Sequence, residues 1–220
     1  MEIVESGFLF EVESKRCILK KVLKTEQIMV IPSHVQALPV DTIGDRAFYQ
    51  CSGVEEVIIP STIGNIRAFA FAESDIVRVT RSINNNSPIL YVDRFAFADC
   101  WHLHIVELGG ATFLEQSGYQ FKNCHNLKQI DSLSIKGSIP LGAFMGSGIH
   151  HFCFTDGMKI GFDAFKDVDL DMVFVTGRLG NTSNFFPTHQ NIKIICEENN
   201  PIINLAYEGY DITFKQGGFV

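Results

Sequence analysis

One short unit recurs along this 220-residue chain: Phe, usually preceded by Ala, then Cys or Ser three positions later, then an apolar run. The clearest copy is AFxxCxxVxxVxIP at Ala47–Pro60. The repeat Phe stands at seven positions: Phe48, Phe71, Phe97, Phe121, Phe144, Phe165 and Phe186. Six intervals cover the 138 residues from the first to the last, so the mean period is 23 residues. Periods of this length are typical of solenoids, in which each repeat forms one coil and stacks on its neighbours.

Each repeat predicts one strand and one turn on the opposite side of the solenoid. In the first copy Val57 and Ile59 are expected to face inward. Glu56 and Ile58 alternate with them and are expected to face outward. The stretch 43–48 then predicts a crossing of the convex side as a short helix or 3₁₀ turn. Burying each repeat Phe contributes roughly 1.5–3 kcal/mol, and only stacked coils bury all the rings in one column.

The repeats and both ends of the chain resemble the BspA-like leucine-rich repeat family, which is common in bacteria and in some protozoan parasites. Gly7–Val12 looks like the opening hairpin of that family. Val30–Ser33, followed by Leu38–Gly44, closely resembles its first coil. Cys196–Phe214 looks like its closing cap. The resemblance implies a strand, a short helix around Pro201–Tyr207 and a final strand at Asp211–Phe214 in this cap.

The predicted fold is therefore an α/β, strand-rich solenoid. It is a leucine-rich repeat superhelix of about seven coils, with a parallel concave sheet, an N-terminal β-hairpin cap and a C-terminal strand-helix-strand cap. The period of 23 lies in the range of about 20–29 residues for such repeats. We expect one domain over 1–220, with the first cap and coil at 1–40, the repeats at 41–195 and the closing cap at 196–220.

Charge and hydropathy exclude several classes of partner. The net charge is −7, from 25 acidic and 18 basic residues. Phosphate binding needs clustered Lys and Arg, so we expect no direct nucleic-acid binding, whereas a basic protein partner would be attracted. No stretch approaches the ~18 apolar residues that span a bilayer, so no membrane insertion is expected. Met1–Glu5 lacks the features of a signal peptide, which predicts a cytoplasmic location; a removed leader would instead place the protein at the cell surface or outside the cell.

The six cysteines are interpreted as structural thiols. Cys51, Cys100 and Cys124 occupy the same repeat position and are expected to be small, buried and reduced. Their spacing lacks the C-x-x-C pairs of zinc sites. The alternative is a disulfide, and Cys100 and Cys124 on adjacent coils are the first pair to test.

One pair of side chains suggests chemistry. Alternation places His151 and Cys153 on the same outward face, about 7 Å apart at Cα, where they could begin a metal site or a Cys–His nucleophile. Asp131, one coil earlier, is the candidate carboxylate. Three other histidines occupy non-equivalent positions and predict no column: His102, His104 and His125. We interpret His151 as a surface residue beside a partly exposed Cys153, and expect no catalytic, metal or cofactor site.

The concave sheet is the expected recognition surface, because outward residues of successive strands form one plane there. Alternation predicts these outward residues: Glu56, Ile58, Arg78, Thr80, Ile105, Glu107, Gln129, Asp131, His151, Cys153, Met172 and Phe174. The N-terminal half of this surface is charged and mixed, and the C-terminal half is apolar. A contiguous exposed apolar patch usually marks an interface, so Met172 and Phe174 are its main candidates. The alternative is that the loop 177–187 covers them.

Three function hypotheses follow from these features, and the first is the leading one. The first is a non-enzymatic protein-binding module that uses the concave face. A sharper form of it is an intracellular inhibitor, of phage or mobile-element type, directed against a basic nucleic-acid-processing enzyme. The alternative that the family resemblance implies is an adhesin on a bacterial or parasite surface.

Overall fold

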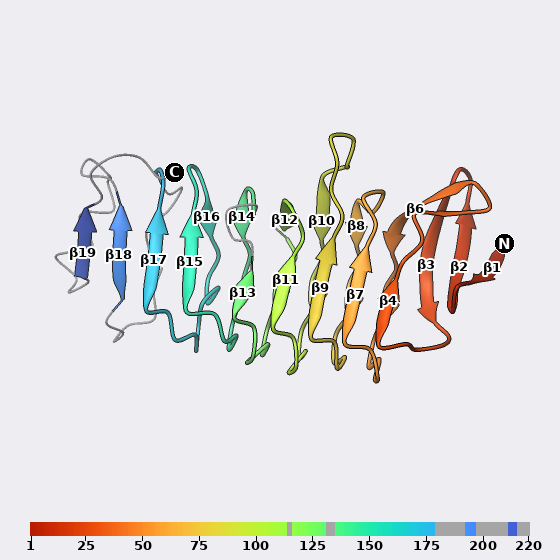
Figure 1. The fold of residues 1–220 in the computed structure, drawn as a ribbon. Coiled ribbons are helices and arrows are strands. Elements are labelled where there is room, and N and C mark those ends of the chain that lie inside the picture. Colours follow the sequence, from red (N-terminus) through yellow and green to blue (C-terminus); the bar gives the residue numbers. More distant parts are fainter. Residues whose placement is uncertain (114–115, 131–134, 179–191, 197–210, 215–220) are drawn as a thin grey trace.

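The computed structural model describes residues 1–113, 116–130, 135–178, 192–196 and 211–214. The chain winds into an elongated solenoid of about seven coils, with an N-terminal hairpin at one end and the last strand at the other (Figure 1). Two rows of strands run along the solenoid, and the inward side chains of both rows form one core. The strand-rich solenoid predicted from the repeats is confirmed.

The front row contains the strand predicted after each repeat Phe. It consists of a five-stranded sheet of order β13-β11-β9-β7-β4 and a four-stranded sheet of order β15-β17-β18-β19. The bounds are β4 Ile28–Val30, β7 Glu56–Ile59, β9 Arg78–Arg81, β11 Ile105–Glu107, β13 Gln129–Ile130, β15 His151–Phe154, β17 Met172–Val175, β18 Lys193–Cys196 and β19 Asp211–Phe214. Every neighbouring pair is parallel. The final strand expected from the closing cap is present as β19.

The back row contains strands that the sequence did not predict, together with the N-terminal cap. Its main sheet has the order β1-β2-β3-β6-β8-β10-β12 with β5 beside β6, and β14 pairs with β16. The bounds are β1 Glu2–Glu5, β2 Phe8–Glu13, β3 Arg16–Val22, β5 His34–Val35, β6 Leu38–Ile43, β8 Asn65–Ile66, β10 Leu90–Val92, β12 Ala111–Phe113, β14 Ser138–Ile139 and β16 Lys159–Ile160. The antiparallel pairs β1–β2 and β2–β3 form the cap, which confirms the opening hairpin.

The repeat Phe rings form one continuous column in the core. Ring centroids of Phe71 and Phe97 lie 4.8 Å apart and those of Phe97 and Phe121 lie 5.0 Å apart, with interplanar angles of 2° and 6°. The stack extends to Phe48 at one end and to Phe165 at the other. All these rings are fully buried. Phe186, predicted as the last repeat ring, lies outside the described residues.

The crossing between the two rows is a run of turns in every described coil, where the sequence predicted a short helix or 3₁₀ turn. The residues two positions before and after each repeat Phe have positive φ, for example 58° at Phe69 and 56° at Glu73. A right-handed helix cannot contain residues with this left-handed backbone, so the stretch cannot continue as a helix. Phe69, Phe71 and Glu73 donate their backbone N–H groups to the next coil, over 3.3, 2.7 and 2.9 Å. The turns therefore form a third hydrogen-bonded wall of the solenoid. The helix expected at 201–207, in the closing cap, lies outside the described residues.

A second aromatic stack covers this wall from outside. Phe69, Phe95 and Tyr119, each two residues before a repeat Phe, stack with centroid distances of 4.9 and 5.0 Å. The guanidinium carbon of Arg46 lies 5.3 Å from the centroid of the Phe69 ring at one end. These three rings are only partly buried, so the solenoid has an inner and an outer aromatic column.

Candidate functional site

The outward residues of the front row form two columns, and we call this surface the front face. Strand register aligns the first column across one sheet as Ile28, Glu56, Arg78, Ile105 and Gln129. The second column contains Val30, Ile58, Thr80 and Glu107. In the other sheet the columns are His151, Met172 and Lys193, and Cys153, Phe174 and Ile195. The alternation read from the sequence therefore places the predicted side chains in common columns; Asp131 lies outside the described residues.

The middle of the front face is a connected group of charged and polar side chains. Arg78 Nη2 lies 2.9 Å from Glu107 Oε2, and Arg78 Nε lies 3.5 Å from Glu56 Oε1. Gln129 Nε2 donates to Glu107 Oε1 over 3.0 Å. These residues come from four consecutive strands, β7, β9, β11 and β13. Because the groups satisfy one another, replacing these contacts with contacts to a partner gains little free energy.

The N-terminal end of the front face is apolar, which the sequence reasoning missed. Ile28 and Val30 on β4 are 52% and 59% exposed. Val30 pairs with the partly exposed Ile58 of β7, so the apolar surface continues onto the next strand. The signal was in the sequence, because MVIPS at 29–33 matches VIIPS at 57–61 position by position, with three apolar residues followed by Pro and Ser. The first coil was recognised at Val30–Ser33, and extending the alternation of outward residues to it would have found this apolar surface.

The C-terminal end of the front face holds the apolar residues that the sequence predicted. Met172 and Phe174 are partly exposed, and Phe174 pairs in register with the partly exposed Ile195. The loop proposed as a cover for them falls largely in 179–191, outside the described residues. Together with the two preceding findings, this gives a face with an apolar group toward each end and a charged middle. In the C-terminal sheet, Lys193 lies in register beside Met172, and β18 and β19 continue the face beyond β17.

The prediction that Cys153 is partly exposed is wrong. Its register places it in the outward column beside Phe174, yet its side chain is buried. Because a Cys side chain is short, larger neighbouring side chains on the same face cover it. Burial also raises the pKa of the Cys153 thiol, which disfavours the nucleophilic thiolate.

His151 has a carboxylate partner other than the one proposed. Its Nε2 lies 2.9 Å from Asp171 Oδ1, and both side chains are about 61% exposed. Among the described residues no group of three His, Cys, Asp or Glu side chains could hold a metal ion. The geometry therefore supports a surface His–Asp pair, with the buried Cys153 unavailable beside it.

The cysteines of the repeat position are free thiols in the structure, as are the other three. Cys100 Sγ donates to the Phe71 carbonyl over 3.0 Å, and Cys124 Sγ donates to the Phe97 carbonyl over 2.9 Å. Each thiol thus fastens its coil to the preceding one. Burial raises the pKa of the Cys124 thiol well above its ordinary value, so this group stays protonated.

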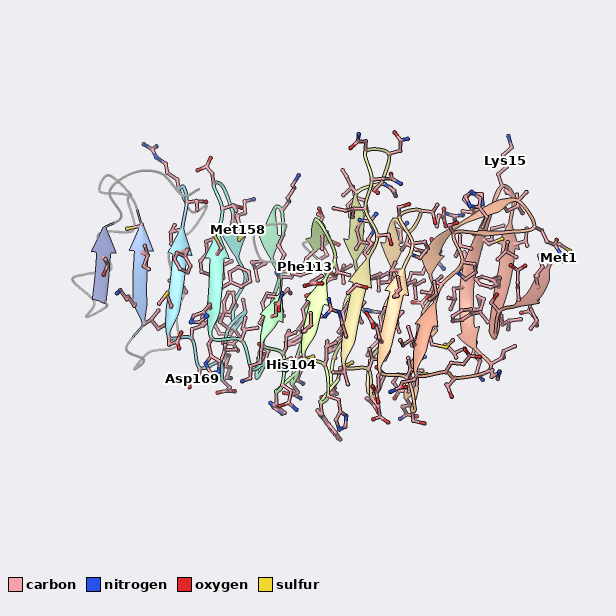
Figure 2. The ribbon with its side chains drawn as sticks, in the orientation of Figure 1. Met1, Lys15, His104, Phe113, Met158 and Asp169 are labelled. Atoms are coloured by element: carbon pink, nitrogen blue, oxygen red, sulfur yellow. The ribbon has the colours of Figure 1, made fainter. Side chains whose placement is uncertain are left out.

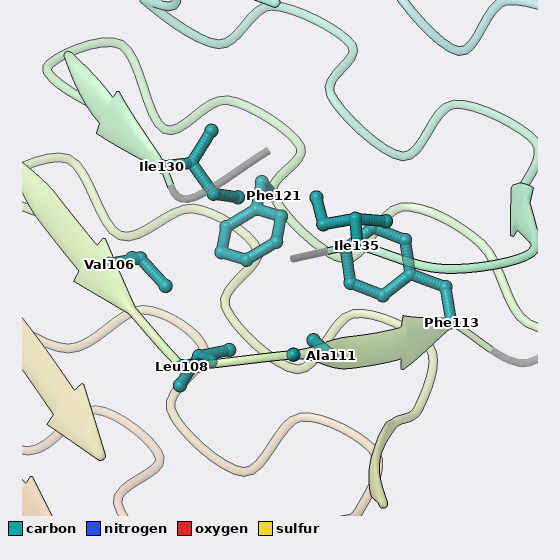
Figure 3. A pocket seen from close by; sticks show the side chains of 9 residues that line it. Val106, Leu108, Ala111, Phe113, Phe121, Ile130 and Ile135 are labelled. Atoms are coloured by element: carbon teal, nitrogen blue, oxygen red, sulfur yellow. The ribbon is translucent and has the colours of Figure 1, made fainter. Parts of the chain in front are cut away.

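Neither of two hollows in the described part of the chain has the shape of a ligand site. The apolar pocket shown in Figure 3 lies between β11, β12 and β13, with Phe113, Phe121 and Ile135 on its walls. Its interior has room for only about one water molecule, far less than the hundreds of Å³ that a ligand site needs. A larger hollow of about 480 Å³ lies beside Arg81 and Glu107 but opens widely to solvent.

Arg81 has a structural role, because it binds backbone carbonyls of two loop segments. Its buried guanidinium donates through Nη2 to the carbonyls of Ile63 and Pro88, over 2.8 and 2.9 Å. The first contact connects β9 to the preceding coil, and the second connects the polar segment Asn84–Pro88 to β9 of its own coil. In the parts of the chain that the structure describes, no helix is long and apolar enough to cross a membrane.

With the columns of the front face and the stacked turns established, comparison with known proteins identifies the family. Residues 41–171 match the BspA type leucine-rich repeat region in six copies. The chain belongs to this family. No curated protein sequence matches the chain.

Two solved structures of leucine-rich repeat proteins share the fold. One is a leucine-rich cell surface protein from Faecalibacterium prausnitzii A2-165, with 23% identity, a TM-score of 0.55, and coverage of 80% of this chain and 54% of that one. The chain thus spans about half the length of that protein. The other is the leucine-rich repeat protein of T. pallidum, with 15% identity, a TM-score of 0.55 and full coverage of both chains. At these identities the likeness concerns the fold alone.

Proposed function

We propose that this BspA-type solenoid is a non-enzymatic protein-binding module, and that its front face is the recognition surface. The observation that carries the proposal is the pair of apolar groups toward the two ends of a face whose charged side chains in the middle already pair with one another. Exposed apolar side chains gathered on one face favour an interface. A partner that spans the face would bury both ends at once.

The binding free energy is expected to come from these ends. Full burial of an exposed aliphatic side chain contributes about 1.5–3 kcal/mol, so completing the burial of half-exposed Ile28 and Val30 contributes about 1 kcal/mol each. Met172 and Phe174 would contribute at the other end. The Glu56–Arg78–Glu107 group would instead select the orientation of the partner, as polar groups in interfaces commonly do.

Co-purification with matched variants tests the proposal. The double variant Ile28→Asp/Val30→Asp should lose partners that the unaltered protein captures from cells of its source organism. The control is Val4→Asp/Ile89→Asp, because these residues are 65% and 62% exposed but belong to β1 and to the segment before β10, away from the front face. Retention of every partner by the front-face variant, with both variants folded, would refute the proposal.

A second candidate is attachment at a cell surface. It is favoured by the similarity to the Faecalibacterium protein, which is described as a leucine-rich cell surface protein. The test is surface biotinylation of intact source cells, followed by detection of the protein. Labelling equal to that of a cytosolic marker would exclude the adhesin role in those cells.

The inhibitor hypothesis remains a prediction from charge. It requires a basic, nucleic-acid-processing enzyme among the captured proteins, and binding that weakens as salt rises. Purified candidate enzyme mixed with the protein should then lose activity in proportion to complex formed.

A further inference from the structure

The front row has an open edge at its N-terminal end. β4 is the last strand of its sheet and pairs with β7 alone (Figure 1). Strand β3 precedes β4 along the chain, but β3 pairs with β2 on one side and with β6 on the other. Within the described ranges no strand pairs with the second side of β4, and we call this side the open edge.

Hydrogen bonds show which backbone groups belong to the open edge. Ile31 N donates to the Ile58 carbonyl of β7 over 3.0 Å. Because the backbone groups of a strand point alternately to its two sides, Met29 faces β7 as well. The N–H and C=O groups of Ile28 and Val30 therefore point to the open edge, and no hydrogen bond of the described chain uses them.

The open edge is short because it is closed at both ends. Glu26 is the preceding residue on this side, and its N–H donates to Met29 Sδ over 3.3 Å. Pro32 is the following residue on this side, and proline has no N–H group to donate. The edge therefore offers the two donors and two acceptors of Ile28 and Val30, which is a ladder for one short strand.

The side chains beside these backbone groups are apolar and exposed. Ile28 and Val30 are each more than half exposed, whereas Ile58, which follows Val30 in the same column, is partly buried. The missing neighbour accounts for this difference, because the inner strands of the sheet have a neighbour on both sides. A strand added beside β4 would cover both side chains and complete the backbone hydrogen bonds.

A second edge strand near the same end is protected, which makes the exposure of β4 specific. β1 begins next to Met1, labelled in Figure 2, and pairs with β2 alone. It has Glu2 and Glu5 at its two ends, and charged residues on an edge strand disfavour pairing with another chain. β4 has no charged residue within its bounds.

We propose that the open edge of β4 binds an extended segment of the partner protein as an additional strand of the front row. The inference rests on the proposed function, because Ile28 and Val30 form the apolar group at this end of the front face. Every neighbouring pair of the row is parallel, and the added strand continues it in the same sense. One residue of the segment then donates to the Ile28 carbonyl and accepts from Val30 N, and apolar residues on either side of it cover Ile28 and Val30.

Amide hydrogen exchange followed by NMR tests the open edge in the full chain. In the free protein the amides of Ile28 and Val30 should exchange like exposed amides. Those of Met29 and Ile31, which face β7, should exchange at least about tenfold more slowly. Protection of Ile28 and Val30 in the free protein would refute the open edge. If dilution removes that protection, a second copy of the chain is the occupant and the choice of partner is wrong.

A synthetic peptide tests the added strand. The probe has the sequence of residues 24–33, since this segment has apolar residues at the two positions that would lie beside Ile28 and Val30. In the parallel register, the N–H of Met29 in the peptide donates to the Ile28 carbonyl of the protein, and the N–H of Val30 in the peptide points away.

Two methylated peptides form a matched pair. N-methylation at Met29 of the peptide should weaken binding by at least about fivefold, because a hydrogen bond is lost and the methyl group occupies its place. N-methylation at Val30 of the peptide removes no such bond and should change the affinity by less than about twofold. The bound peptide should also protect the Ile28 and Val30 amides of the protein from exchange. No binding up to about 1 mM peptide, or equal weakening by the two methylations, would overturn the proposal.

The outcome is separable from that of the proposed function. If the peptide fails while Ile28→Asp/Val30→Asp still loses its captured partners, the front face binds through side chains and the added strand is wrong. If the peptide binds as predicted while that variant keeps every partner, the front-face proposal is wrong and the added strand stands.

Discussion

The two aromatic columns allow a direct test of what stabilises the solenoid. Phe97 and Phe95 are two residues apart, and each stacks between a ring of the preceding coil and a ring of the following one, at 4.8–5.0 Å. Phe97 is fully buried, while Phe95 is partly exposed. The pair therefore separates burial in the core from ring stacking as such.

Replacing each residue with Ala should give different costs. Phe97→Ala removes a buried ring and leaves a cavity, which typically costs about 3–5 kcal/mol. Phe95→Ala loses part of the apolar burial and two stacking contacts, about 1–2 kcal/mol in total. The left-handed backbone at Phe95, with φ of 54°, strains Ala as it strains Phe, so this strain cancels in the comparison.

Urea denaturation followed by circular dichroism measures both free energies of unfolding. Phe97→Leu serves as a control that keeps most of the buried volume and should cost less than about 1.5 kcal/mol. Equal losses in Phe97→Ala and Phe95→Ala would refute the reasoning, because the inner column would then contribute no more than the outer one.

Two further predictions concern the turns and the buried thiols. Asp167 has a φ of 56°. Asp167→Val should therefore lower the free energy of unfolding by about 1–2 kcal/mol, whereas Asp167→Gly should leave it unchanged or raise it, as measured by denaturation of the two variants. A Val variant as stable as the Gly variant would contradict the left-handed turn. Because burial raises the pKa of the Cys124 thiol, the folded state holds this proton more tightly than the unfolded state does. The contribution of this thiol to the free energy of unfolding is therefore fully present below about pH 8.5, and it is lost as the pH rises further. Cys124→Ala should flatten that fall between pH 8 and 10, and an unchanged slope would count against the buried, protonated thiol.

The fold was largely predictable because its signal repeats. A pattern of Phe, a small thiol or hydroxyl, and alternating apolar residues recurs with a mean period of 23, and each copy supports the others. The alternation in Glu56–Ile59 was enough to assign the inward and outward columns of the front face. The resemblance supplied the caps, and β2 and β19 lie where it placed them.

The features that the sequence did not yield depend on contacts between coils. The back-row strands are two or three residues long in β8 and β10, too short for a periodic pattern. Each turn has a left-handed residue two positions before and two positions after the repeat Phe, and side chains as different as Phe69 and Glu73 occupy these positions. No propensity rule distinguishes such positions from a 3₁₀ turn.

The front-face residues were likewise predictable only in part, because some of their features depend on contacts between coils. Alternation placed Met172 and Phe174 outward, but the burial of Cys153 depends on the size of its neighbours, and the pairing of His151 with Asp171 depends on the next coil. The apolar end at Ile28 and Val30 was missed because the first coil was recognised only by its resemblance, and the alternation of outward residues was read from Glu56 onward.

The central claim, that a partner protein lies across the front face, is tested most directly by site-specific photocrosslinking. Benzoylphenylalanine introduced at position 58, in the second column of the front face, should capture the partner polypeptide in source cells. The same group at position 89, exposed but outside that face, should capture none. Crosslinking from position 89 with none from position 58 would contradict the account.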